Sequence, residues 1–225
     1  GIDDLVDYNP LGIEEAGGSS DCPITPTQGT PAFKPKQGQH FLVFPLKVPA
    51  LIGNAWQYSS LDVSPFGNST YQKHSAFDLL VGTKTAIVAT CTGYAIADKS
   101  TYGKTNAFGL LIIIMCDQKV EDTNNNWHTL FSLDAHLYSS LIPITLGSRT
   151  YFHEKYAEYI AQGKAIPVIA GQIIGYTFKA GNPPWNHLHH HLYFDCYGAC
   201  NGQLLNHYYA AVDPYDIYAL TTKKN

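Results

Sequence analysis

Four of the ten histidines fall between positions 187 and 191, in the segment Asn186–Tyr193 with the sequence NHLHHHLY. On a β-strand successive side chains point to opposite faces, so His187, His189 and His191 would share one face and His190 the other. Imidazole is the commonest metal ligand and titrates near neutral pH. The segment therefore predicts a metal-centred site in which one imidazole binds the ion and another handles protons. The alternative is a half-exposed strand that is rich in histidine by chance.

Two other segments place histidine beside a carboxylate. His74 and Asp78 form an HxxxD pair just before the apolar run Leu79–Val81. Asp134-Ala-His136-Leu137 ends the segment WHTLFSLDAHL. Carboxylate and imidazole both bind zinc, at about 2.0–2.2 Å. Each segment alone is a weak signal, because a single histidine is more often structural.

Together these segments contain the parts of a zinc site that hydrolyses amides. We expect His74, Asp78 and His189 to hold one zinc ion per chain, which leaves a fourth position open for water. Zinc lowers the pKa of such a water to about 7. His187 and His136 would then accept the proton of the water and stabilise the developing oxyanion.

The composition limits the possible partners. The chain of 225 residues is 45% hydrophobic and only 14% charged, with a net charge of −4. This balance argues against a disordered chain and leaves no broad basic surface for nucleic acid. No apolar run approaches the roughly 20 residues that span a bilayer. The first ten residues, GIDDLVDYNP, have neither the basic region nor the apolar region of a signal peptide. The sequence carries no indication of an oligomeric state.

The elements that must position these residues are mostly strands. Residues 1–39 are rich in Gly, Pro, Ser and Thr and are interpreted as a linker or an extended strap. From residue 40 to 225, short apolar or alternating runs separated by turns predict one antiparallel, mainly β (α+β) domain. Phe152–Gln162 predicts one short helix with Phe152, Tyr156, Tyr159 and Ile160 on one face. The stretch Glu121–Trp127 predicts a hairpin tip.

The five cysteines give an indication of the cellular compartment in which the protein works. Cys91 and Cys116 lie in apolar segments that we expect to be neighbouring strands, while Cys196 and Cys200 flank a turn and Cys22 stands alone. Two disulfides and one spare thiol would suit an exported protein, so we expect a secreted, periplasmic or cell-envelope location. The alternative is five free thiols in a cytosolic protein.

The order of these motifs resembles that of the LytM/lysostaphin-type zinc metallopeptidases, peptidase family M23. The family shows HxxxD, then an AHL-type segment, then HxH, and here these are His74 to Asp78, Ala135-His136-Leu137 and His187-Leu188-His189. The alternative HxH pair is His189-His190-His191, and we prefer the first pair because Leu188 lies between its histidines. Shorter similarities lie at Phe44–Leu46, Thr92–Tyr94, Phe108–Leu110, Gly163–Gly175 and Val212–Pro214. The resemblance covers roughly residues 44–218.

The resemblance implies an antiparallel β-sheet fold, a zinc bound by His74, Asp78 and His189, and catalytic assistance from His136 and His187. It also implies a secreted endopeptidase that cuts peptide cross-links of bacterial peptidoglycan. Two alternatives are a peptidase of another protein and a non-enzymatic binding or regulatory module. The chain departs from the family after HLH, where it has His190 and His191 in place of an aromatic residue and an acid. His191 would extend the site, bind a second metal or face solvent, and we favour solvent.

Overall fold

The computed structural model describes residues 35–39, 41–48, 50–52, 76–99, 109–177, 187–194, 211–212 and 217–218. In these residues the chain forms twelve strands and one helix. The strands are β1 (Leu51–Ile52), β2 (Phe77–Leu80), β3 (Ala86–Val88), β4 (Gly93–Lys99), β5 (Leu110–Cys116), β6 (Val120–Glu121), β7 (Trp127–His128), β8 (Leu130–Ser140), β9 (Ile166–Val168), β10 (Ile173–Thr177), β11 (His187–Phe194) and β12 (Ala211–Val212), and the helix is α2 (Ser148–Ala161).

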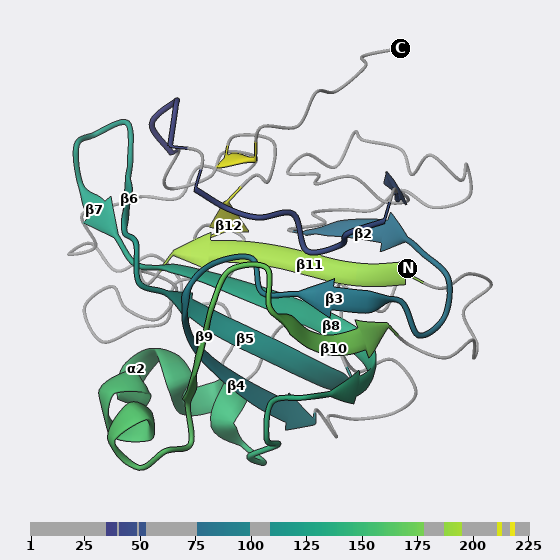
Figure 1. The fold of residues 1–225 in the computed structure, drawn as a ribbon. Coiled ribbons are helices and arrows are strands. Elements are labelled where there is room, and N and C mark those ends of the chain that lie inside the picture. Colours follow the sequence, from purple (N-terminus) through teal and green to yellow (C-terminus); the bar gives the residue numbers. More distant parts are fainter. Residues whose placement is uncertain are drawn as a thin grey trace, which may run out of the picture.

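The strands build one large antiparallel sheet in the order β1-β2-β11-β8-β5-β4-β9 (Figure 1). Strand β10 pairs with the end of β8 and with β3, and β12 pairs with β11. The predicted mainly β, antiparallel fold with a single helix is confirmed. No helix in the described ranges is long and apolar enough to cross a bilayer.

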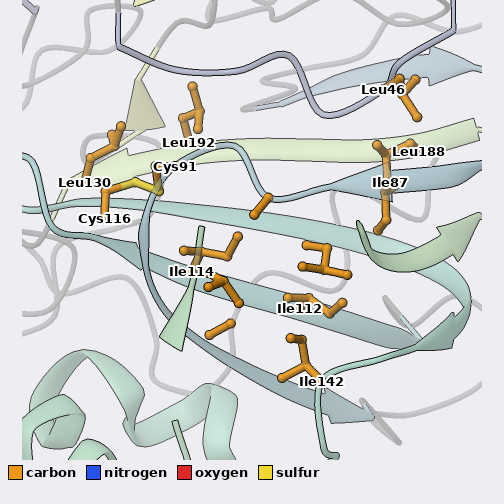
Figure 2. Packing of buried hydrophobic residues seen from close by; sticks show 14 of the residues in the cluster. Leu46, Ile87, Cys91, Ile112, Ile114, Cys116, Leu130, Ile142, Leu188 and Leu192 are labelled. Carbon is orange, nitrogen blue, oxygen red and sulfur yellow. A yellow bond between two sulfur atoms is a disulfide. The ribbon is translucent and has the colours of Figure 1, made fainter. Parts of the chain in front are cut away.

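One face of the sheet carries the larger apolar core. Alternating residues of β5 and β11, among them Ile112, Ile114 and Leu188, point into it (Figure 2). The disulfide between Cys91 and Cys116 belongs to the same cluster, with an S–S distance of 2.04 Å. The expectation of neighbouring strands holds in part, because Cys116 ends β5 whereas Cys91 lies in the bend just before β4, the strand that pairs with β5. The other three cysteines lie outside the described residues.

Helix α2 packs on the opposite face. Phe152 and Tyr159 are buried there, and the ring of Phe152 meets that of Phe131 on β8 at 6.0 Å between centroids. Tyr156 is 42% exposed, so the prediction that it shares the buried face is wrong. Helix α2 is kinked at Lys155, whose φ of −120° and ψ of 22° are not helical, so the ideal helical spacing that put Tyr156 on the face of Phe152 does not hold across this point.

The helix also begins earlier than predicted, at Ser148 and not at Phe152. The carboxylate of Asp98, on β4, accepts hydrogen bonds from the backbone N–H groups of Gly147 (3.1 Å) and Arg149 (2.9 Å). An acceptor at this position satisfies N–H groups that the first turn of a helix leaves without an intrahelical partner. Because this cap comes from a distant strand, the local sequence does not reveal it.

The stretch predicted as a hairpin tip is the turn between β6 and β7, as expected. The side chain of Asp122 closes this turn by accepting hydrogen bonds from the backbone N–H groups of Asn124 and Asn126. Residues 35–39 lie against the hairpin, where the Lys36 N–H donates to the Glu121 carbonyl at 2.9 Å. Residues 1–34 lie outside the described part of the chain, so a linker that ends at residue 39 stays a prediction.

The close approach of β4 and β5 requires glycine at position 93. A Cβ atom there would overlap the carbonyl oxygen of Met115. We expect Gly93→Ala to lower the free energy of unfolding by about 1–3 kcal/mol, because backbone must move to relieve the overlap. Denaturant unfolding measures this change. Gly82→Ala is the control, since its Cβ would lie 3.7 Å from the nearest atom, Thr85 Oγ1. Equal stability of the two variants would contradict the steric account.

Candidate metal and catalytic site

Strand β11 lies between β2 and β8, and the site forms where these three strands meet. In the antiparallel register His189 lies opposite Asp78 on β2 and opposite Ala135 on β8. Directly opposite residues share a face of the sheet, so His189 and Asp78 point to the same side. That side also carries helix α2 and its apolar cluster.

Three of the predicted site residues converge here in a buried position. The carboxylate oxygen Oδ1 of Asp78 lies 3.3 Å from His189 Nδ1 and 3.8 Å from His187 Nε2. Asp78 is fully buried, and the two histidines are only 2% and 6% exposed. The strand alternation that predicted a shared face for His187 and His189 is confirmed.

The spacing of these atoms suits a shared zinc ion. Two ligand atoms bound to one tetrahedral zinc at about 2.0–2.1 Å lie about 3.3 Å apart. The distance between Asp78 Oδ1 and His189 Nδ1 is 3.3 Å. A carboxylate and an imidazole are also a donor pair that zinc accepts. Among the described residues no three side chains of His, Cys, Asp or Glu form a metal-binding group. His74, the third predicted ligand, lies outside them.

His136 reaches the site because of a β-bulge. Along β8, Asp134 pairs with Ile112 of β5 and Leu137 pairs with Leu110, so β8 holds one residue more than β5 between these pairs. His136 has a positive φ of 59°, which places it in the left-handed region. Regular alternation would send its side chain to the face opposite Ala135. A bulge instead re-aims a side chain, and the His136 ring lies 5.0 Å from the ring of His187 and 5.8 Å from that of His189.

His191 also lies on this side, next along β11. Its ring is 6.4 Å from that of His189 and 5.1 Å from that of Tyr193. The residue is fully buried, so the prediction that it faces solvent is wrong. The side of β11 that carries His191 continues at Tyr193 into the cluster under α2, which is why water does not reach it.

Sequence reasoning assigned no role to Asp134. The structure places it on the other face of the sheet, directly opposite His190, with 2.7 Å between Asp134 Oδ1 and His190 Nδ1. The two residues are 56 positions apart, so no local motif connects them. Their pairing follows only from the register of β8 against β11.

Comparison with known proteins finds similar folds. No family model and no curated protein sequence matches the chain. Among solved structures, the antimicrobial peptidase lysostaphin from Staphylococcus simulans is 17% identical, with a TM-score of 0.43, over 74% of this chain and 48% of its own. The chain thus spans about half of that lysostaphin.

Two other solved structures match in the same way. The catalytic domain of the prophage-encoded M23 protein EnpA from Enterococcus faecalis is 19% identical over 78% of this chain and 95% of its own, with a TM-score of 0.42. A zinc-containing peptidase from Vibrio cholerae is 15% identical over 73% of this chain and 38% of its own, with a TM-score of 0.43. Likeness at this level concerns the fold and assigns no residue role, substrate or cofactor to this chain.

The converging donors predict that Asp78 contributes to zinc binding. We expect Asp78→Asn to weaken zinc binding at least about tenfold, because the neutral amide is a poorer ligand than a carboxylate. Competition with a chromophoric chelator measures the affinity. The control is Asp117→Asn, which removes an exposed carboxylate from the turn after β5. Unchanged zinc affinity in Asp78→Asn would exclude this residue as a ligand.

Proposed function

We propose that this chain is a zinc-dependent endopeptidase that hydrolyses peptide cross-links of bacterial peptidoglycan. The observation that carries the proposal is the convergence of one carboxylate and three imidazoles from three strands, in which Asp78, His187 and His189 are buried and His136 is half-buried. These groups are the donors and proton carriers that metal-assisted amide hydrolysis needs. The order of the motifs in the sequence supports the same reaction.

In this proposal the residues divide into two sets. Asp78, His189 and His74 would hold the zinc, which when bound supplies a Lewis acid and lowers the pKa of water. His187 and His136 lie beside these ligands and are not proposed to bind the metal. One of these imidazoles accepts a proton at a ring nitrogen, and the other donates an N–H hydrogen bond to the oxyanion that develops on the scissile carbonyl.

The buried position of the cluster contributes to this chemistry. Hydrogen bonds and charges act more strongly where water is excluded, because the local dielectric constant is low. The strand framework holds His187 and His189 in fixed directions, so little reorganisation is needed when charge develops. Placing the groups on strands, and not on loops, favours accurate positioning of the reacting atoms.

Peptidoglycan is proposed as the substrate on two grounds. The family that the motifs resemble commonly cuts its peptide cross-links, and lysostaphin, a matching structure, is described as an antimicrobial peptidase. The low charge of this chain also suits a substrate that is bound largely through its peptide backbone. Tyr138 lies two residues after His136 on β8 and is 45% exposed, so an aromatic surface is available near the site.

Secretion into an oxidising compartment is part of the proposal. The Cys91–Cys116 disulfide closes a loop with a sequence separation of 25 and lies in the main core. Disulfides persist in extracellular, periplasmic and cell-surface proteins and are rare in the cytosol. The bridge therefore supports a secreted or cell-envelope location, where peptidoglycan is accessible.

The test is digestion of purified peptidoglycan followed by mass spectrometry of the released fragments. We expect the metal-loaded protein to release new amino groups, a chelator to abolish the release, and about one zinc per chain to copurify. The fragment masses identify the bond that is cut. Intact, metal-loaded protein that binds the cell wall but releases no amino groups would show a binding module. Cleavage of a protein substrate only would indicate the other alternative.

A substitution at His136 separates catalysis from metal binding. Asparagine tolerates the left-handed conformation, so His136→Asn should keep the bulge and the fold. We expect zinc content to stay near the wild-type value while turnover falls about 10²–10⁴-fold, the usual contribution of a general acid or base.

The control for this variant is His128→Asn, which removes a buried imidazole from the hairpin at the far end of β8. Its turnover per folded molecule should stay close to that of the wild type. Loss of zinc from His136→Asn would mean that His136 is a ligand and that its proposed role is wrong.

A further inference from the structure

A chain of buried polar side chains lies behind the site, on the opposite face of the sheet. His190 contacts two partners: its Nδ1 is 2.7 Å from Asp134 Oδ1, and its Nε2 is 2.7 Å from the hydroxyl oxygen of Tyr218. That hydroxyl lies 3.1 Å from Thr90 Oγ1. All four residues are buried, with at most 4% exposure. The reaction proposed above uses none of them.

The chemistry of the groups decides which atom donates and which accepts in these hydrogen bonds. An ionised carboxylate can only accept, so His190 Nδ1 donates to Asp134. Burial raises the pKa of Tyr218 well above its usual range, against the lowering effect of Thr90, and the negative charge of Asp134 raises it further. Tyr218 therefore keeps its proton and has a hydrogen to share with His190 or Thr90.

The surroundings of this pair are apolar. Leu188 and Leu192, which flank His190 on the same face of β11, both belong to the main core (Figure 2). Burying a carboxylate and an imidazole costs desolvation that a hydrophobic pair would avoid. A buried polar pair is thus weak evidence for stability, and its best-attested use is to specify one arrangement of neighbouring elements.

The sequence of β11 is compatible with more than one register against β2 and β8. One face of the strand has His187, His189, His191 and Tyr193, and the other has Leu188, His190, Leu192 and Phe194. A slip of one residue would exchange the two faces, and burial of the leucines opposes it. A slip of two residues leaves every side chain of β11 on its own face of the sheet. It would place His187 or His191 opposite Asp78 in place of His189.

The pair between Asp134 and His190 distinguishes these registers. In the observed register His190 lies opposite Asp134, while His189 lies opposite Asp78. A slip of two residues would put Leu188 or Leu192 opposite Asp134 and leave its buried carboxylate without an imidazole. An ion that loses its buried partner is strongly disfavoured.

We propose that the pair Asp134–His190, extended to Tyr218, fixes the register of β11 so that His189 meets Asp78 and not a neighbouring histidine. These are positioning residues, which act on the site through the strand that they hold. The effect on catalysis rests on the function proposed above, whereas the register itself does not.

The main experiment replaces the pair by leucines, in Asp134→Leu/His190→Leu. Because a buried polar pair can be exchanged for apolar residues of similar volume with little loss of stability, we expect a folded protein. Its cross-strand proton contacts in NMR should show more than one register, with the Ser132–Leu192 contact weakened. Its zinc affinity should fall about tenfold, the size of effect found when a group that orients a ligand is lost. The kcat should fall with it, and KM should change little.

A matched control exists in the same chain. His128 Nε2 and Asp122 Oδ2 form a second buried pair, also at 2.7 Å, in the β6–β7 hairpin. His128 lies eight positions before His136, which corresponds to at most about 26 Å of extended chain. Asp122→Leu/His128→Leu should keep the Ser132–Leu192 contact, the zinc affinity and kcat, whatever it does to melting temperature.

A conservative variant tests the hydrogen bond itself. Asp134→Asn retains an oxygen that can accept from His190 Nδ1, so it should restore a single register and near wild-type zinc affinity. If the double leucine variant does not fold, Asp134→Leu is measured in the same way, with the same expectation, because it leaves no buried carboxylate and keeps the contact of His190 with Tyr218.

A single register with unchanged zinc affinity in the leucine variants would overturn the proposal. Multiple registers in Asp134→Asn would overturn the hydrogen-bond account of it. If the wild-type protein cuts no peptidoglycan, the proposed function fails. The NMR contacts still decide whether the pair sets the register.

Discussion

The register of β11 between β2 and β8 is the constraint on which the site depends. A β-strand offers one side chain in two to each face, and here the functional side chains come from all three strands. Asp78 meets His189 only because these residues lie opposite each other in the ladder. A displacement of two residues would keep every side chain of β11 on its own face of the sheet and still replace His189 by another histidine. The alternation of faces therefore does not by itself assemble the site.

The β-bulge in β8 is a second feature on which the site depends, and it interrupts the regular alternation of side chains along that strand. It allows Ala135 and His136 to lie on the same side of the sheet, although they are neighbours in sequence. A residue other than glycine in the left-handed region costs of order 1 kcal/mol, and such strain collects at functional sites. The paired strands on both sides of β8 hold this conformation in place. His136 thus obtains its direction from backbone geometry, whereas His187 obtains its direction from simple alternation.

The chain has few charged residues, and several of its carboxylates are buried. Asp98 caps helix α2, Asp122 closes the β6–β7 turn and pairs with His128, and Asp134 pairs with His190. Burial by itself would raise the pKa of Asp122, yet the hydrogen bonds from His128 and from the backbone of Asn126 and Asn124 lower it. The partners of these carboxylates supply the hydrogen bonds that make burial tolerable.

The sequence by itself determined the class of the fold and most of the candidate site. Short alternating runs indicated antiparallel strands, and the spacing of His187 and His189 indicated a shared face, because both follow from the two-residue period of a strand. Tertiary structure alone decided which residues on other strands meet them. The pairing of His190 with Asp134, the direction of His136, the cap from Asp98 and the burial of His191 all depend on contacts between residues that are distant in sequence. Local periodicity contains no information on register or bulges, since these are set when one strand pairs with another.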